Sequence, residues 1–285
     1  MKTLITGASG FIGRALLRQN LTGDLHVTSR VYTSVPAGIT GLFGDLSDQE
    51  FVKRLAEQKF EQVIHLAWEG LPNLSEGNNL RNLKTSKQFL EIMAYSGVEE
   101  FHIAGSCLEY GDKCGQLNEG VIGENLSDFA SAKMELLEFV AGLGVPYKWY
   151  RIFYAYGPFQ HDNSLLSSAF LSAKNGVSLK LSNPNISRDF IYVDDIAKAM
   201  SRLIETTGVS GIFNIGSGKG TLVKDLVGAL NSIMGLEVQD LAAEESPALT
   251  ADINKITKTC GWTPEVSIEQ GVKKFVDWKD LGTRE

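Results

Sequence analysis

The amino-acid sequence predicts an α/β fold in which a parallel sheet is covered by helices on both faces. Three observations carry this prediction. Short strand-type runs alternate with amphipathic segments of helix length through the first half of the chain. A glycine-rich turn joins the first strand to the first helix. After Pro158 the alternation loosens, so we expect a second, smaller region that packs closely on the first with a cleft between them.

The first half of the chain holds the clearest elements. Two starts of helices are marked by possible capping boxes, Ser47 to Glu50 and Ser267 to Gln270. We expect strands at residues 2–6, 25–29, 62–67, 101–105 and 147–153, and helices at 12–21, 47–57, 80–96 and 128–141.

The second half is less regular. We expect a helix near 164–175, a strand at 177–181 and mostly helix from Thr221 onward. The segments "DFIYV" (189–193) and "GIFNIG" (211–216) have the pattern of strands that return to the main sheet, with a helix at 194–205 between them.

The composition excludes several classes of function. The chain has 285 residues, of which 43% are hydrophobic and 21% charged, which is enough to form a sizeable core. A net charge of −7 gives no basic surface for nucleic acid or an anionic membrane. The early apolar run "TLITG" is too short for a signal sequence or a membrane span, so we expect a cytoplasmic protein. Three cysteines without paired spacing argue against a disulfide framework and a metal site.

The turn after the first strand has the composition of a dinucleotide site. In "TLITGASGFIGRALL", Gly7, Gly10 and Gly13 stand between the first strand and the first helix. Glycines there permit a tight turn, close approach of the backbone to a pyrophosphate, and close packing of helix on strand, with the helix N-terminus facing the anion. The sequence therefore predicts a nicotinamide dinucleotide site built on this turn.

The end of the second strand indicates which dinucleotide. An acidic residue there would bond the ribose hydroxyls, whereas an arginine accommodates a 2′-phosphate. The chain has Ser29 and Arg30 and no carboxylate, so we expect NADP(H) to be preferred, with NAD(H) possible. Alternatively, Arg30 stacks on the adenine or faces solvent. Asp45, after the third strand, is placed to bond the adenine amino group or to serve only its own turn.

These segments and several others resemble the extended short-chain dehydrogenase/reductases, the nucleotide-sugar epimerase/dehydratase group. The resemblance covers nearly the whole chain: "TGASGFIG", "GDLSD", "HLAW", "GSCLEYG", "RIFYAYGP", "RDFIYVDDIAKAM", "FNIGSG" and "CGWTPEVSIEQGV" follow in the family's order. It implies a doubly wound parallel (Rossmann) sheet with a smaller, interleaved C-terminal substrate lobe, and commonly a homodimer. The implied dinucleotide-binding domain is 1–156 plus about 190–215, and the implied lobe is 157–189 plus 216–285.

The resemblance also assigns roles to individual positions. Ser106 would bond the reacting sugar oxygen, Lys133 the nicotinamide ribose, and Arg188 the diphosphate of a nucleotide sugar. His161 could touch the substrate or be a solvated loop residue. The implied cofactor contacts are Gly7, Gly10, Phe11, Ile12, Gly13, Ser29, Arg30, Asp45, Leu46, Leu66, Ala67, Asn82 and Lys133, and the implied substrate contacts are Trp68, Ser106, Asn163 and Arg188.

Three departures from the family pattern matter. Phe129 stands four residues before Lys133, where the family has its catalytic tyrosine, so the usual proton donor is missing. A second diphosphate arginine is often found before "ADINK", but Glu244 and Glu245 stand in that region. Cys107 and Leu108 occupy the positions where 4,6-dehydratases carry adjacent Asp and Glu, which disfavours dehydration.

The resemblance leaves more than one reaction open. Ser29 and Arg30 favour an NADP(H)-dependent 4-keto reductase of a nucleotide-activated deoxyhexose, similar to enzymes of the CDP-abequose synthase type. A 4-epimerase with tightly bound NAD is the alternative, as is a cofactor and sugar-nucleotide binder of low activity. In an active enzyme, the proton would come from Ser106 through water, from Lys133 itself, or from another tyrosine such as Tyr110 or Tyr154.

Overall fold

The computed structural model describes residues 1–31, 35–71, 74–177, 179, 181–236 and 246–281. Two expectations from the sequence fall outside these residues: Glu244 and Glu245 entirely, and the strand at 177–181 in part.

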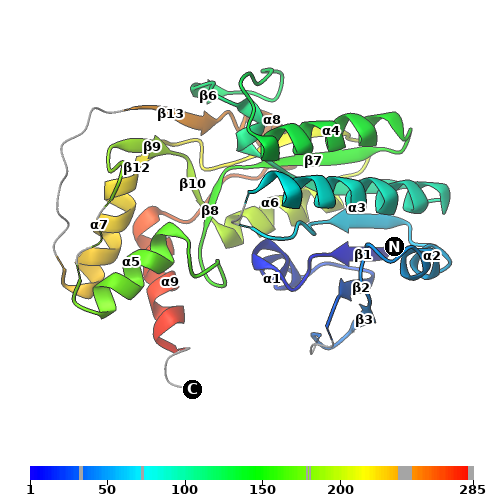
Figure 1. Ribbon diagram of the computed structural model, residues 1–285, viewed down its shortest axis with the longest axis horizontal. Coiled ribbons are helices and arrows are strands. Elements are labelled where there is room, and N and C mark those ends of the chain that lie inside the picture. Colours follow the sequence, from blue (N-terminus) through cyan, green and yellow to red (C-terminus); the bar gives the residue numbers. More distant parts are fainter. Residues whose placement is uncertain (32–34, 72–73, 178, 180, 237–245, 282–285) are drawn as a thin grey trace.

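The main sheet contains seven parallel strands in the described part of the chain (Figure 1). Their order is β11-β7-β5-β4-β1-β2-β3, so the direction of winding reverses beside β1, where a doubly wound sheet leaves a crevice at the carboxyl ends of its strands. The bounds are β1 (Lys2–Thr6), β2 (Asp24–Ser29), β3 (Ile39–Phe43), β4 (Gln62–His65), β5 (Glu100–Ser106), β7 (Tyr147–Ile152) and β11 (Gly211–Ile215).

Helices bury both faces of this sheet, as predicted. Successive strand residues point to opposite faces. Leu4 and Trp149 accordingly pack in one core with α2 (Gln49–Ala56), α3 (Glu76–Tyr95) and α4 (Asp128–Gly142). Their neighbours Ile5 and Tyr150 belong to a second core with α1 (Phe11–Leu17) and α6 (Val193–Glu205). The layered α/β prediction is therefore confirmed.

The remaining elements form a second region with its own core of residues such as Phe170, Leu230 and Phe275. It has a four-stranded sheet, β12 (Thr221–Leu222), β9 (Ile186–Arg188), β13 (Ser246–Ala251) and β6 (Gly115–Leu117), and a two-stranded sheet, β8 (Tyr154–Tyr156) with β10 (Phe190–Tyr192). Its helices are α5 (Leu165–Lys174), α7 (Val223–Met234) and α9 (Ile268–Leu281). Helix α8 (Asn254–Cys260) instead packs on the main sheet, because its Ile256 belongs to the core that α1 and α6 share. A short helical turn, η1 (Cys107–Tyr110), follows β5.

Several sequence expectations need correction. The strand in "GIFNIG" joins the main sheet as β11, but the strand in "DFIYV" does not, because β10 pairs with β8 instead. Asp48 rather than Ser47 caps α2, since its carboxylate accepts hydrogen bonds from the backbone N–H groups of Glu50 (2.9 Å) and Phe51 (3.3 Å). The second capping box is confirmed: Ser267 and Gln270 bond each other's backbone N–H groups at 3.3 and 3.1 Å.

Two helices of the first half also differ from the expected bounds. α1 ends at Leu17, not at residue 21, and α3 begins at Glu76, four residues before the expected start. The exact division into residues 1–156 plus 190–215 and residues 157–189 plus 216–285 stays a prediction. Among the described residues, no helix is both long enough and apolar enough to cross a membrane.

Candidate functional site

A cavity of about 690 Å³ opens at the carboxyl ends of β1, β2 and β4, where the winding of the sheet reverses. The position agrees with the rule for ligand sites in open α/β sheets. Twelve of the residues named above as cofactor contacts line it, namely Gly7, Gly10, Phe11, Ile12, Gly13, Ser29, Arg30, Asp45, Leu46, Leu66, Ala67 and Asn82, and so does Trp68.

The glycine turn has the shape that a dinucleotide requires. Gly7 has a φ of +70°, and a Cβ on it would lie 2.7 Å from the backbone nitrogen of Ala67. A Cβ on Gly13 would lie 2.3 Å from the carbonyl oxygen of Gly7. Among the described residues, no side chain caps the N-terminus of α1, and its first turn has no acidic residue. The turn therefore presents free backbone N–H groups to the cavity, which fits the diphosphate of a nicotinamide dinucleotide.

Arg30, which follows β2, forms an ion pair with one carboxylate and acts on the charge of a second from farther away. Its Nη1 is 2.6 Å from Oε1 of Glu69, and both side chains are more than half exposed. Asp45 uses Oδ1 to accept hydrogen bonds from the N–H (2.8 Å) and hydroxyl (2.7 Å) of Ser47. These bonds, and the more distant charge of Arg30, lower the pKa of Asp45. Asp45 thus serves its own turn while also lining the cavity.

Asn82 on α3 holds the backbone of Glu69. Its Oδ1 accepts a hydrogen bond from the Glu69 N–H at 2.7 Å, and its Nδ2 donates to the Glu69 carbonyl at 2.9 Å. Asn82 is itself buried. The segment after β4 is therefore fixed at the rim of the cavity, and Glu69 is a rim residue that the sequence motifs did not single out.

Lys133 lies behind the wall of the cavity rather than in it. It is on α4 and is buried, and its Nζ donates a hydrogen bond of 2.9 Å to the carbonyl of Ala104, which does line the cavity. The amine also lies over the ring of Trp68, 3.8 Å from its centroid. Burial lowers the pKa of Lys133 to about 7, against the opposing effect of Glu109.

Phe129 shares a face of α4 with Lys133, as its spacing predicts. Its ring centroid is 5.9 Å from the Lys133 amine and 5.8 Å from the ring of Trp68, which it meets edge to face. Phe129 is buried. The three side chains form one cluster, which we call the Trp68 cluster, against the cavity wall.

Ser106, at the end of β5, is held by a buried charged network. The Glu109 carboxylate is fully buried and accepts hydrogen bonds from the Ser106 N–H (2.7 Å), the Trp149 indole (3.0 Å) and Arg151 Nε (2.9 Å). The Ser106 hydroxyl in turn accepts a hydrogen bond of 3.2 Å from the Leu108 N–H. The sequence motif "GSCLEYG" contains Glu109 but does not by itself indicate this role.

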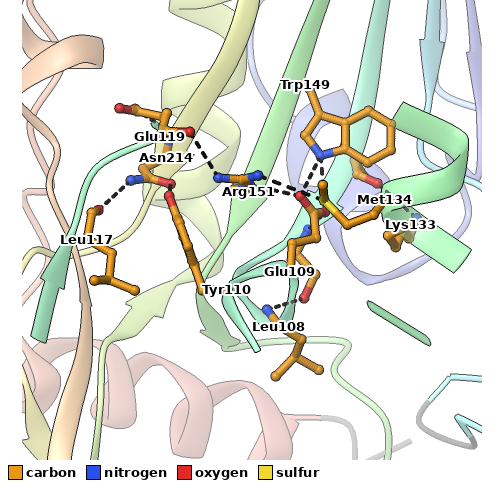
Figure 2. Close-up of polar contacts among 12 residues, drawn as sticks. Leu108, Glu109, Tyr110, Leu117, Glu119, Lys133, Met134, Trp149, Arg151 and Asn214 are labelled. Carbon is orange, nitrogen blue, oxygen red and sulfur yellow. Dashed lines mark hydrogen bonds and ion pairs between the residues drawn. The ribbon is translucent and has the colours of Figure 1, made fainter. Parts of the chain in front are cut away.

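The same network extends into the second region of the protein. Arg151 lies over the ring of Tyr110, 4.5 Å from its centroid. The Tyr110 hydroxyl shares its one proton between Oδ1 of Asn214 at 2.8 Å and the Asn118 carbonyl at 3.0 Å. Asn214 in turn donates to the Leu117 carbonyl at 2.9 Å (Figure 2). The loop of Ser106 is thereby tied to β6 of the smaller sheet.

The remaining residues expected to contact substrate lie apart from the cavity lining. Arg188 on β9 stacks over Tyr154 at 5.1 Å, and its charge acts on Cys107, next to Ser106. Asn163 is exposed, and its N–H donates to Nδ1 of His161 at 3.1 Å. His161 is exposed and does line the cavity, together with Phe159. The predicted roles of Arg188 and Asn163 stay predictions.

Comparison with known proteins agrees with this architecture. The chain is 28% identical over 241 residues to dTDP-6-deoxy-L-talose 4-dehydrogenase (NAD(+)) of Aggregatibacter actinomycetemcomitans, covering 77% of this chain and 85% of that protein. It is 26% identical to dTDP-4-dehydro-6-deoxyglucose reductase of Escherichia coli, covering 96% of each. The crystal structure of UDP-glucose 4-epimerase from Thermotoga maritima with UDP-glucose superposes with a TM-score of 0.86 at 25% identity, covering 99% of this chain and all of that one.

The model of the NAD dependent epimerase/dehydratase family matches residues 3–216, from the first strand to the end of β11. This match spans both the glycine turn and the segment from Ser106 to Lys133. The chain therefore belongs to the NAD dependent epimerase/dehydratase family, as the sequence motifs predicted, and is an enzyme of the short-chain dehydrogenase/reductase type.

Proposed function

We propose that the protein is an NADP(H)-dependent reductase of the 4-keto group of a nucleotide-activated deoxyhexose. The observation that carries the proposal is that Arg30, directly after β2, lines the cavity. The acidic residue that would bind ribose hydroxyls at this position is absent from the sequence. Two relatives support the sugar chemistry by name, since both are named for a 4-position reaction of a dTDP-linked 6-deoxy sugar. A cytoplasmic homodimer is part of the same proposal.

Residues of the cavity, and Ser106 outside its lining, divide the work of binding. The glycine turn would hold the diphosphate of the dinucleotide, and Arg30 the 2′-phosphate. A bound nicotinamide dinucleotide supplies the hydride that reduces the sugar ketone. Ser106 is fixed by Glu109 so that its hydroxyl can bond the oxygen of that ketone.

Lys133 is our candidate for the proton donor in place of a tyrosine. Tyr110 is fully buried and already donates to Asn214, and burial raises the pKa of Tyr154 to about 12. Lys133, with a pKa of about 7, can exchange a proton near neutral pH. As the ketone oxygen takes up negative charge, the ammonium would release a proton to it directly or through Ser106.

This assignment gives a pH dependence. The donor must be protonated, and the fraction of protonated Lys133 falls as the pH rises through about 7. We expect the reductive kcat to be constant in acid and to fall about tenfold per pH unit above this value. A profile of kcat against pH tests it. A kcat that stays constant well above neutral pH contradicts a proton donated by Lys133.

Consumption of NADPH with a 4-keto-6-deoxy sugar nucleotide tests the proposed reaction. We expect net oxidation of NADPH and a single 4-hydroxy product. An epimerase would instead interconvert 4-hydroxy sugars with no net loss of NADPH. Absence of both activities would leave a binding protein on a dehydrogenase scaffold and would contradict the proposal.

The cofactor preference has a separate test. Arg30→Ala should weaken NADPH binding at least about tenfold because charge-assisted contacts to the 2′-phosphate are lost, whereas NADH binding should change by less than about twofold. The dissociation constants follow from quenching of tryptophan fluorescence on titration. Equal losses for the two cofactors would contradict a role of Arg30 in choosing between them.

One observation favours the 4-epimerase as a second candidate. The ion pair of Arg30 with Glu69 neutralises the guanidinium that would attract a 2′-phosphate, which suits NAD. The structural similarity to the Thermotoga maritima epimerase is compatible with this reading. The NADPH assay described above separates the two candidates.

A further inference from the structure

The carboxylate of Glu69 is the negative charge closest to Arg30 in the cavity rim. The two residues lie in segments that follow different strands, Arg30 after β2 and Glu69 after β4. Both line the cavity. Their ion pair of 2.6 Å therefore spans the rim of the dinucleotide site. No sequence motif accounts for Glu69.

The geometry makes this ion pair a competitor of the cofactor phosphate. The N–H donors of a guanidinium lie along the edges of its plane, and they bind a carboxylate or a phosphate equally well. Both side chains are exposed, at 61% and 53%, and exposed pairs contribute little net stability, so a phosphate can exchange with the carboxylate. Asn82 bonds the backbone N–H and carbonyl of Glu69, so the backbone of this residue stays at the rim and a displaced carboxylate stays within the length of its own side chain.

We propose that Glu69 is a specificity-determining residue that lowers the affinity of the site for a 2′-phosphate, by occupying Arg30 before binding and by repelling the phosphate afterwards. Adenosine ribose with free hydroxyls carries no charge to repel, so NAD(H) is not penalised. The proposal rests on the dinucleotide site proposed above, but it concerns the ratio of the two affinities and not which cofactor the natural protein prefers.

The test uses two fragments that differ only in the phosphate of interest, adenosine 2′,5′-bisphosphate and adenosine 5′-monophosphate. Their dissociation constants are measured by calorimetry on the purified protein and on Glu69→Gln. This substitution removes the charge and keeps the backbone bonds to Asn82, so the protein should fold normally. We expect the bisphosphate to bind about fivefold to tenfold more tightly to the variant, and the monophosphate to change by less than about twofold.

Glu265→Gln is the matched control. It removes one negative charge from another exposed ion pair, that of Lys198 with Glu265 at 2.5 Å, and neither residue lines the cavity. It should change both dissociation constants by less than about twofold. An equal tightening of the bisphosphate by Glu265→Gln would mean that net charge alone acts, which would overturn the role of Glu69.

A double-mutant cycle with Arg30→Ala tests the pairing itself. If Glu69 acts mainly by occupying Arg30, Glu69→Gln should improve bisphosphate binding less than half as much in the Arg30→Ala background. An improvement of the same size in both backgrounds would overturn the occupation of Arg30 and leave direct repulsion of the phosphate as the whole effect. No improvement in either background overturns the proposal.

The two proposals can fail separately. If the natural protein binds the monophosphate as tightly as the bisphosphate, its NADP(H) preference is refuted. If Glu69→Gln nevertheless shifts the ratio toward the bisphosphate, the role of Glu69 stands. A ratio that Glu69→Gln leaves unchanged refutes that role, whichever cofactor is preferred.

Discussion

Glu109→Ala should lower the free energy of unfolding by about 3–5 kcal/mol, because it leaves a buried guanidinium without its partner. Arg151 is buried, and its Nε donates to the Glu109 carboxylate at 2.9 Å. The same carboxylate also accepts hydrogen bonds from the Ser106 N–H and the Trp149 indole N–H. Alanine removes the acceptor for all three donors at once (Figure 2).

Denaturant unfolding followed by circular dichroism measures this loss. Glu138→Ala on α4 is a suitable control, since Glu138 is an exposed carboxylate, and it should cost less than about 0.5 kcal/mol. Arg151→Met should be destabilising too, because it leaves the Glu109 carboxylate buried without its cationic partner. A loss below about 1 kcal/mol for Glu109→Ala would show that water or a rearranged side chain satisfies Arg151, and would contradict a rigid network beneath Ser106.

Phe129→Tyr should raise the turnover number at least about tenfold if the missing phenol limits the reaction. The ring already lies beside the Lys133 amine, at 5.9 Å from its centroid, in the cluster that backs the cavity. A tyrosine hydroxyl there would add a proton donor next to a cation that favours its ionised form.

The turnover number with NADPH and a 4-keto-6-deoxy sugar nucleotide measures this gain. Phe139→Tyr, which makes the same chemical change on the same helix but outside the Trp68 cluster, should leave turnover within about twofold. An unchanged turnover number in Phe129→Tyr would contradict the view that the phenol is the limiting defect. Such a result would favour Lys133 as a sufficient donor, or a Trp68 ring that separates residue 129 from the substrate.

Local patterns in the sequence were enough to predict the central layers of the fold and the position of the cavity. The alternation of strand-type runs with amphipathic helix-length segments predicted the parallel sheet. The spacing of the glycines predicted a tight turn, and the structure shows that turn at Gly7 and Gly13. The four-stranded sheet could not be predicted in this way. β6 and β9 are only three residues long, and both lie far from β13 in the sequence, so pairing in the folded protein defines this sheet more than local propensity does.

The partners of the charged residues could not be predicted from the sequence either. Lys148 and Arg151 stand in a strand that is otherwise apolar and aromatic, and buried charges of this kind require partners. That signal was available, but it could not identify Glu100 and Glu109 as those partners. The pair of Arg30 with Glu69 left no local signal, because the two residues follow different strands that only the folded sheet brings near each other.

Transfer of deuterium from labelled NADPH to the sugar tests the central claim most directly. The enzyme is incubated with a 4-keto-6-deoxy sugar nucleotide and NADPH deuterated at either face of nicotinamide C4, and the product is examined by NMR and mass spectrometry. Our account predicts that one of the two labelled forms places deuterium at C4 of the product sugar as NADPH is consumed. Formation of a C4 epimer from a 4-hydroxy sugar nucleotide, with no deuterium gained from either form and no NADPH consumed, would contradict it.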